Sequence, residues 1–290
     1  FKNRLTATFD WFDRRTTGML AAGIEIPKVV GTSAPLQNVA NMKNRGWELN
    51  VTWRDKIGAV DYHIGFNLYD SQAEITKFNN ESRLLSDYYV GRKIGEIWGY
   101  VADGYYTLDD FNEADARHKT WTLKPGVTKI NGANPQPGVD NPGDRKIIGN
   151  DAARYQFGAN LGASYKGFSL DVMLQGVGKR DYWLGGAALF PFGGAGAGDA
   201  VFQALYANQT DYWRAKSYDP ASPDYMQPVN PNSKLFRIYD QGNNVGSNTR
   251  VSDKYLQNAA YLRIKNITLA YTLPKIWVRR AMLQDAKLYV

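Results

Sequence analysis

The chain lacks cysteine, has only two histidines, and contains no apolar run near the roughly twenty residues that a membrane-spanning helix needs. The absence of cysteine excludes disulfide frameworks and thiolate metal sites. The two isolated histidines, His63 and His118, argue against an all-protein zinc site. If the chain enters a membrane, it must therefore do so through strands.

The charge of the chain has no strong local bias. The net charge of +7 comes from 35 basic and 28 acidic residues that are spread along 290 residues. A nucleic-acid-binding protein carries a clustered basic stripe, and none is found here. The charge balance indicates a solvated surface and no nucleic-acid partner.

Long alternation of apolar and polar residues is the main positive feature. The clearest stretch covers residues 45–68, where two alternating runs flank a brief turn predicted at Asp55 to Ala59. One wholly apolar and one wholly polar face, over about ten residues, is what lipid on one side and water on the other require of a strand. The predicted apolar face consists of Trp47, Leu49, Val51, Trp53, Val60, Tyr62, Ile64, Phe66 and Leu68.

Further segments show the same period of two. In the run from Phe168, Met173 is the one apolar residue on the polar face, and Phe12 breaks the pattern of the first segment. In the last long segment the apolar face changes parity near Asn266, which predicts a β-bulge. These strands are predicted at Arg4–Asp13, Arg154–Tyr165, from Phe168 onwards, Tyr261–Leu273 and Ala286–Val290.

The connections between these strands alternate in length. Long connections of roughly thirty or eighty residues alternate with short turns, as in a barrel with long extracellular loops and short periplasmic turns. The connection Pro274 to Gln284 is predicted to be periplasmic. The mean hydropathy of −0.47 does not oppose this reading, because lumen-facing residues dilute the lipid-facing ones. The predicted fold class is all-β, a transmembrane antiparallel β-barrel.

Three features of the loops resemble active-site motifs but have simpler interpretations. The glycine-rich segment Leu189 to Ala200 lacks the spacing and the strand-to-helix context of a phosphate-binding loop, so we expect a flexible loop. Asp109 and Asp110, between Thr107 and Phe111, read as the acidic start of a short helix. Asp211 resembles an acid/base group by residue type alone. No catalytic residue is predicted, and the chain is not expected to be an enzyme.

Four segments resemble SusC-like TonB-dependent transporters of the bacterial outer membrane, the SusC/RagA family. Asn41–Leu49 looks like the family's segment that enters a barrel strand, and Ile97–Phe111 is similar to an extracellular segment. Gly143–Asp181 resembles the family's most recognisable hairpin, and Tyr255–Pro274 resembles a strand near its C-terminus. The matches follow the family's order and extend over most of the chain.

The resemblance implies that residues 1–290 form the C-terminal part of a larger barrel. Barrels of about twenty-two strands are wide and plugged, and the plug domain and the N-terminal segment that contacts TonB would lie outside this chain. The implied function is TonB-dependent import of a large nutrient, in first place an oligosaccharide or other glycan, across the outer membrane. The implied partners are a SusD-like surface lipoprotein that closes the barrel, TonB, an oligosaccharide or peptide ligand, and outer-membrane lipid. No cofactor is implied.

One departure from the family concerns calcium. Family members often carry an aspartate- and glycine-rich loop before the strand that corresponds to "IIGN", whereas this chain has only Asp140 and Asp144 nearby. Calcium takes six to eight oxygen ligands. We therefore predict no metal site.

Aromatic residues of the loops are the candidate ligand contacts, because sugar rings stack on flat apolar faces. The alternative, purely structural interpretation is that such residues pack the core of the loops or a partner interface. Trp11, Trp53 and Tyr165 are expected in the interfacial girdle and His63 in the wet lumen. The candidate substrate-binding residues are Tyr88, Trp98, Tyr182, Trp183 and Trp213.

Three alternatives remain open. A TonB-dependent receptor for a peptide, a metal chelate or a cobalamin-like solute would share the barrel, and a passive porin would share the alternation. A secreted, soluble carbohydrate-binding β-domain would also be rich in aromatic residues and free of cysteine. Sandwich strands are shorter, typically about five or six residues, and bury one face against a second sheet.

The predicted topology can be checked by labelling, because the chain has no cysteine of its own. Single cysteines introduced at Asn79 and at Asn232 are expected to react with a membrane-impermeant maleimide on intact cells, since both positions lie in long loops. A cysteine at Lys166, in a short turn, is expected to react only after the outer membrane is permeabilised. Labelling at Lys166 without labelling in the loops would invert the topology.

Overall fold

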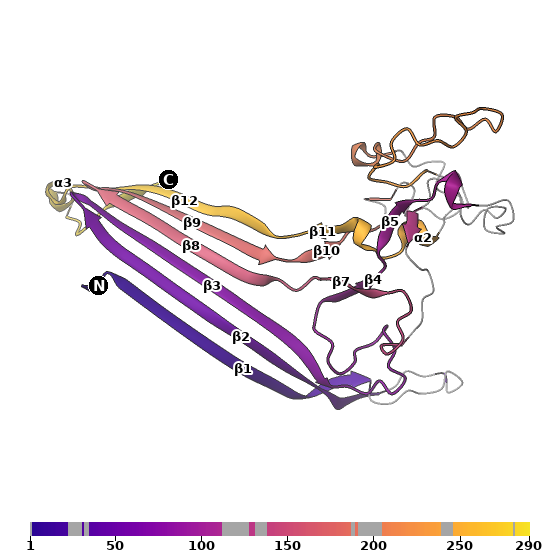
Figure 1. Cartoon of the computed structure of the whole chain (residues 1–290). Helices are drawn as coiled ribbons and strands as arrows, with labels where there is room; N and C mark the ends of the chain where they lie inside the picture. The colour runs from indigo at the N-terminus through magenta and orange to yellow at the C-terminus, as the bar shows by residue number, and fades with distance from the viewer. Residues whose placement is uncertain are drawn as a thin grey trace.

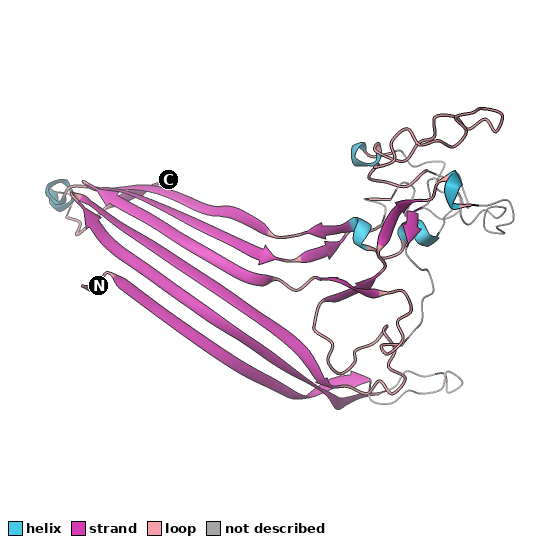
Figure 2. Ribbon diagram, viewed as in Figure 1, coloured by secondary structure: helices cyan, strands magenta, loops and turns pink. Residues whose placement is uncertain are grey.

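A computed structural model describes residues 2–22, 31, 35–111, 128–130, 138–186, 189–190, 205–238, 246–280 and 282–290. Figure 1 shows one long sheet whose strands run side by side, with the long loops gathered at one end and the short turns at the other. Figure 2 shows how strongly strands dominate the molecule. The alternation of short and long connections therefore places the two kinds of connection at opposite ends of the sheet.

The sheet is antiparallel throughout, in the order β1-β2-β3-β8-β9-β12-β13. Every neighbour in the sheet is the next strand of the sheet along the chain, so the topology is an up-and-down meander. The strands are β1 Leu5–Ala22, β2 Leu36–Ile57, β3 Val60–Lys77, β8 Arg154–Tyr165, β9 Phe168–Lys179, β12 Tyr261–Thr272 and β13 Lys287–Tyr289. The predicted antiparallel barrel strands are confirmed.

The predicted boundaries were too short at the first hairpins. β1 continues to Ala22 and β2 begins at Leu36, because the ladder goes on beyond the point where the outward residues stop being apolar. The turn between β2 and β3 was predicted at Asp55 to Ala59, but Asp55 still pairs with Tyr62 in the ladder. Gly58, with φ +61°, and Ala59 alone connect the strands.

One face of the sheet is apolar across all the long strands. Trp53 on β2 lies between Leu5 on β1 and Ile64 on β3 in one row of paired residues. Many of these side chains are exposed in this chain, Phe9 and Trp11 at 64% each. The complete row reads Leu5, Trp53, Ile64, Leu161, Val172 and Ile267.

The apolar band crosses the sheet obliquely. On β2 the uninterrupted run ends toward the short-turn end at Trp53, because Asp55 follows on the same face. On β9 the band reaches Phe168, two rows nearer that end. Toward the long loops, the band on β9 ends at Leu174, which lies in the same row of paired residues as Ala7 of β1. On β1 the band continues for two more rows of this face, to Trp11. Barrel strands tilt by roughly 35–45°, and a membrane slab cuts tilted strands at such a slant.

A β-bulge keeps β12 in this band. Ile264 pairs with Leu174 and Ile267 pairs with Val172, and the register shifts between Ile264 and Asn266. Lys265 is the extra residue, so Ile264 and Ile267 lie on the same apolar face although they are an odd number of residues apart. The bulge predicted from the parity change is confirmed.

Glycines on the polar face make room for side chains of neighbouring strands. A Cβ on Gly46 would lie 2.5 Å from Cζ of Phe12, whose ring stacks on Tyr69 with 6.3 Å between centroids. Phe12 therefore breaks the alternation because it packs across Gly46. Met173, the other exception, sits between Asn160 and Asn266 on the same polar face.

The short turns use residues with positive φ. The β8–β9 turn consists of Lys166 and Gly167, with φ +47° and +91°, which is the geometry of tight hairpins. The β12–β13 connection, predicted to be periplasmic, contains α3 (Lys275–Arg280) after Pro274. Helix α2 (Gly246–Thr249) lies among the loops at the other end. Within the described residues, no helix is both long and apolar enough to cross a membrane.

The long loops contain secondary structure of their own. Small two-stranded sheets pair β4 with β7, β5 with β6, and β10 with β11. The strands are β4 Glu96–Gly99, β5 Ala102–Tyr105, β6 Thr128–Ile130, β7 Lys146–Asn150, β10 Asp181–Trp183 and β11 Leu256–Asn258. The short 3-10 helices are η2 Leu108–Asp110, η4 Ala207–Gln209 and η5 Asp253–Tyr255. Of the glycine-rich segment predicted as a flexible loop, residues 191–200 lie outside the described residues.

The close contact at Gly46 generates a stability prediction. A Cβ at Gly46 would meet the backbone oxygen of Asp70 at 2.6 Å, whereas a Cβ at Gly65 would meet nothing nearer than 3.7 Å. We expect Gly46→Ala to destabilise the barrel by about 1–3 kcal/mol through overpacking. The measurement is the thermal midpoint of the detergent-solubilised full-length protein, with Gly65→Ala as the matched control. Equal midpoints for the two variants would contradict the packing of Phe12 over Gly46.

Candidate functional site: the polar face and the loop body

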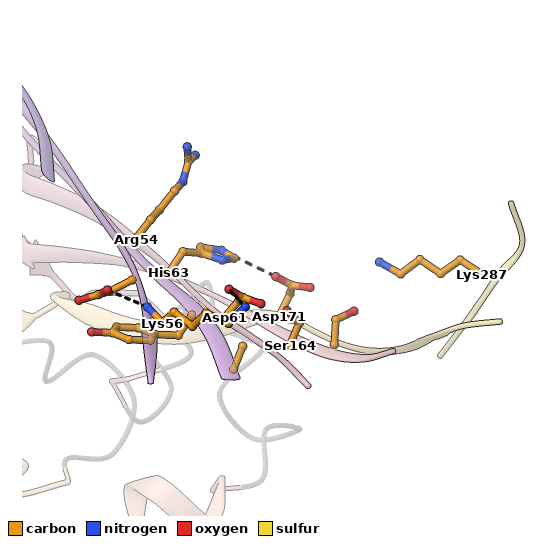
Figure 3. Close-up of a pocket in the computed structure, with 11 residues that line it drawn as sticks. Arg54, Lys56, Asp61, His63, Ser164, Asp171 and Lys287 are labelled. Atoms are coloured by element: carbon orange, nitrogen blue, oxygen red, sulfur yellow. Dashed lines mark hydrogen bonds and ion pairs between the residues drawn. The ribbon is translucent and has the colours of Figure 1, made fainter. Parts of the chain in front are cut away.

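The polar face carries a charged hollow near the short-turn end. Figure 3 shows residues from β2, β3, β8, β9 and β13 around it. Its volume is about 580 Å³. The labelled residues are Arg54, Lys56, Asp61, His63, Ser164, Asp171 and Lys287.

One lysine–aspartate ion pair and one histidine–aspartate contact organise this hollow. Nε2 of His63 lies 3.8 Å from Oδ1 of Asp171, and Nζ of Lys56 lies 3.3 Å from Oδ1 of Asp61. His63 crosses above Gly162, where a Cβ would collide with the imidazole ring. His63 thus lies on the polar face, as predicted from the alternation.

A second hollow lies farther toward the long-loop end and is lined mainly by amides. Its volume is about 440 Å³. Oε1 of Gln175 accepts hydrogen bonds from Arg263 and from Lys265, both at 3.2 Å. Amide, phenol and cationic groups offer both donors and acceptors to a polar solute. The polar residues that line this hollow are Asn67, Tyr69, Gln156, Asn160, Gln175 and Lys265.

The polar face offers binding groups rather than a catalytic constellation. Within the described residues, no group of three or more His, Cys, Asp or Glu side chains could hold a metal ion. In the segment that corresponds to the family's aspartate-rich loop, the carboxylate of Asp140 pairs with Nε of Arg83 at 2.6 Å. The face is therefore suited to weak, multiple contacts with a polar solute.

The long loops pack around a hydrophobic core of their own, which we call the loop body. Phe190 lies with its ring centroid 5.0 Å from that of Tyr255, edge to face, and 5.9 Å from that of Phe236. Leu189 and Leu235 are fully buried. The buried members are Tyr105, Leu189, Phe190, Trp213, Ala215, Met226, Leu235, Phe236 and Tyr255.

Contacts between residues far apart in sequence join the loop after β3 to the loop after β9. The hydroxyl of Tyr105 donates to the carbonyl of Ser233 at 3.0 Å, and the backbone N–H of Thr128 donates to Oδ1 of Asn248 at 2.8 Å. The N–H of Ala102 donates to Oδ1 of Asp253. Burial raises the pKa of Tyr255 to about 12, so its phenol is neutral at physiological pH. The two loops therefore form one body.

The predicted short helix at Asp109 and Asp110 is confirmed as η2. Oδ2 of Asp110 accepts the N–H of Thr107 at 2.7 Å, and Oδ1 accepts Nζ of Lys129 at 2.6 Å. Burial raises the pKa of the Asp110 carboxyl, but the hydrogen bonds from Lys129 and Thr107 outweigh it and hold that pKa below its usual value. Asp110 thereby ties η2 to β6, which is a structural role.

Three of the five aromatic residues predicted to contact ligand lie on or near accessible surface. Tyr88 is 44% exposed, packs edge to face on Phe78, and has the Arg92 guanidinium 5.2 Å from its ring centre. Tyr182 is 51% exposed on β10. Trp98 on β4 is half-buried, and its Nε1 donates to the hydroxyl of Tyr89 at 3.1 Å.

The other two aromatic residues belong to the loop body. Trp213 is 1% exposed, and Trp183 packs against the core with its ring centroid 6.2 Å from that of Phe190. Their placement favours the packing role over contact with a solute. Asp211 accepts the N–H of Lys234 at 3.1 Å, which also fits a structural role. The five residues are thus not brought together into one site.

The margins of the apolar face are rich in aromatic rings. Nε1 of Trp53 donates to the hydroxyl of Tyr62 at 3.1 Å, and Phe168 lies 4.5 Å from Tyr271 between ring centroids. Trp11 and Tyr165 occupy the last positions of the band on their strands. These positions suit an interfacial girdle, and that role remains a prediction for Trp11, Trp53 and Tyr165.

Two chemically distinct faces on an antiparallel meander, with large loops at one end, define part of the wall of a transmembrane β-barrel. No protein-family model matches the chain. The chain is 25% identical, over its whole length and 27% of the relative's, to TonB-dependent receptor P3 of Formosa agariphila. It is 22% identical to TonB-dependent receptor SusC of Bacteroides thetaiotaomicron, over 94% of this chain and 25% of SusC.

A solved structure shows the same fold. The RagAB peptide importer in its closed-closed state matches with a TM-score of 0.63 and 21% identity, over all of this chain and 29% of that chain. The resemblance to SusC-like TonB-dependent transporters is therefore confirmed. The chain spans about a quarter of the length of the curated relatives.

Sequence reasoning missed the ion pairs that lie on the outward face beyond the apolar band. Asp70, 5% exposed, accepts Nη2 of Arg154 at 2.6 Å across two strands that are far apart in sequence. Arg45 pairs with Asp13 in the same way. For Asp13 and Arg45 the signal was present, because they continue the outward parity of Trp11 and Trp47.

The loop body generates a prediction about Trp213. Replacing a fully buried tryptophan by alanine costs about 3–5 kcal/mol, so we expect Trp213→Ala to open the loops to protease while the barrel stays folded. The measurement is limited proteolysis of the full-length protein in detergent, with heat-modifiable gel migration as the readout for the barrel. Tyr206→Ala, at a residue 62% exposed in the same loop, is the control. Unchanged protease resistance in Trp213→Ala would show that this core does not hold the loops.

Proposed function

We propose that this chain forms the C-terminal part of the barrel of a bacterial outer-membrane importer that is energised through TonB. Its cargo is a large nutrient, in first place an oligosaccharide, and a SusD-like surface lipoprotein covers its extracellular mouth. The plug and the segment that contacts TonB belong to parts of the protein outside this chain. The chain supplies barrel wall and loops and carries out no covalent chemistry.

The observation that carries this proposal is the pairing of six long strands, which lines up apolar residues on one face of the sheet and polar residues on the other. The row from Leu5 to Ile267 is apolar, while the adjacent row on the other face runs from Thr6 through Asn160 to Asn266. Lipid solvates the first face and a water-filled lumen the second. The similarity to TonB-dependent receptors along the whole chain supports the energy source.

The geometry suggests how this part of the wall serves import. A cargo that passes a polar lumen must bind weakly at several places, since a single tight site would hold it. The amides around Gln175 and the charged hollow around His63 provide such contacts at two heights of the polar face. Tyr88 and Tyr182 are exposed in the loops and offer stacking faces at the entrance.

A peptide cargo is the second candidate. The structural neighbour RagAB is described as a peptide importer. On the polar face, the described residues offer Arg54 and Lys287 no ion-pair partner, and both cations are suited to a carboxylate. A metal chelate or cobalamin-like solute has no such support. A soluble carbohydrate-binding domain is disfavoured because it would have to cover the whole apolar face.

Purification of the native full-length protein tests the proposal. Outer membranes are extracted in mild detergent, and intact mass spectra are taken of the protein and its companions. We expect a chain several times longer than 290 residues, with a surface lipoprotein bound. Deletion of the gene is expected to abolish growth on the cargo, tested with oligosaccharides and with peptides as sole nutrient source. An isolated chain of 32.6 kDa in the soluble fraction would refute the barrel importer.

A further inference from the structure

Charged residues continue the outward face of β1 and β2 directly beyond the apolar band. The register between the strands is unbroken from Leu5 to Thr16, so Asp13 and Arg15 point to the same side as Trp11. On β2, Arg45 lies opposite Asp13 and next to Trp47 on this face. The outward side therefore changes from tryptophan to a cluster of ions within one step of the pleat.

The cluster consists of one carboxylate between two guanidinium groups. Oδ2 of Asp13 accepts Nε of Arg45 at 3.0 Å, and Oδ1 lies 3.6 Å from Nε of Arg15. The carboxylate is largely covered, with 17% of its side chain exposed, whereas the arginine side chains are 54% and 73% exposed. The neighbouring cation Lys43 is already neutralised by Glu74 at 3.1 Å. Among the described residues, one positive charge is therefore in excess.

Among the described residues, Asp13 takes up few of the donors of the two arginines. Each guanidinium has five N–H donors in a fixed fork that matches the oxygens of a phosphate. Each arginine contacts Asp13 through its Nε, at 3.0 Å for Arg45 and 3.6 Å for Arg15. A single arginine would suffice to neutralise Asp13. The second arginine creates a preorganised site for an anion.

The height of the cluster identifies the anion. Tryptophan rings settle at the headgroup level of a membrane, and Trp11 and Trp47 are the outward apolar residues of β1 and β2 that directly adjoin the charged cluster. Asp13 and Arg45 lie two residues beyond them, about 6–7 Å farther along the strand. That is the depth at which lipid phosphates lie. On β1 and β2 the cluster lies on the side of the apolar band that faces the long loops, which the proposed topology assigns to the outer leaflet.

We propose that Arg15 and Arg45, positioned by Asp13, bind the phosphate of a phosphorylated glycolipid in the outer leaflet. This inference rests on the proposed outer-membrane location. The bound lipid would lie with its acyl chains along the apolar face of β1 and β2 and its headgroup on the two arginines. It adds a specific lipid site on the outside of the barrel, independent of the cargo.

The test measures lipid binding to the full-length protein in detergent. The probe is diphosphoryl lipid A, titrated by native mass spectrometry into the wild-type protein and the Arg15→Gln/Arg45→Gln variant. Loss of two charge-assisted contacts is expected to weaken binding about tenfold or more. Dephosphorylated lipid A is expected to bind the wild type as weakly as the variant binds the probe, and inorganic phosphate at the same concentration is expected not to compete.

Arg14→Gln is the matched control, because Arg14 is the intervening residue on β1 and points to the opposite face. It is expected to bind the probe like the wild type, and all variants should fractionate with the outer membrane and keep the wild-type melting temperature. Equal affinity of the double variant, or equal binding of the dephosphorylated lipid, would overturn the inference. Competition by inorganic phosphate would overturn the lipid as the source of the anion. Absence of the wild type from the outer membrane would instead refute the proposed function.

Discussion

The structure depends on one constraint: inside a membrane, every backbone N–H and C=O must pair with a neighbouring strand. An unbroken ladder fixes which residues share a face, since a slip of one position would turn every side chain over. Along the apolar band the chain meets this constraint from β1 to β12 and makes one correction. At Lys265 a bulge absorbs an extra residue, so that Ile264 and Ile267 both stay on the lipid side.

The constraint no longer applies where the chain leaves the membrane. The loops there must instead bury their own apolar side chains. They cannot bury apolar side chains against the sheet, because its two faces are committed to lipid and lumen. They therefore form a core of their own around Trp213 and Tyr255. Side chain-to-backbone hydrogen bonds such as that from Tyr105 to Ser233 tie distant segments together. An ordered entrance results from the packing of the two loops against each other.

The sequence predicts this fold well wherever a period of two applies. The strands, their order, the bulge near Asn266 and the start of a short helix at Asp109 follow from local patterns alone. The patterns fail for contacts across long separations, such as Asp70 with Arg154 or Thr128 with Asn248. They also cannot tell an exposed loop aromatic from a buried one. Tyr182, Trp183 and Trp213 look alike in sequence, and only the packing of the loop body separates them.

Charged residues are distributed differently on the two faces of the sheet, and this difference locates the membrane. On the polar face, ions such as Asp10, Glu48 and Asp171 lie at the same heights as the apolar band, because water solvates them there. On the outward face of β1 and β2, charge appears only beyond the band, with Asp55 at one end and Asp13 at the other. A charged group at the bilayer midplane of a barrel costs about 2–4 kcal/mol. The outward ion pairs therefore mark where lipid tails end, and the slanted line that they follow across the strands records the tilt of the barrel wall.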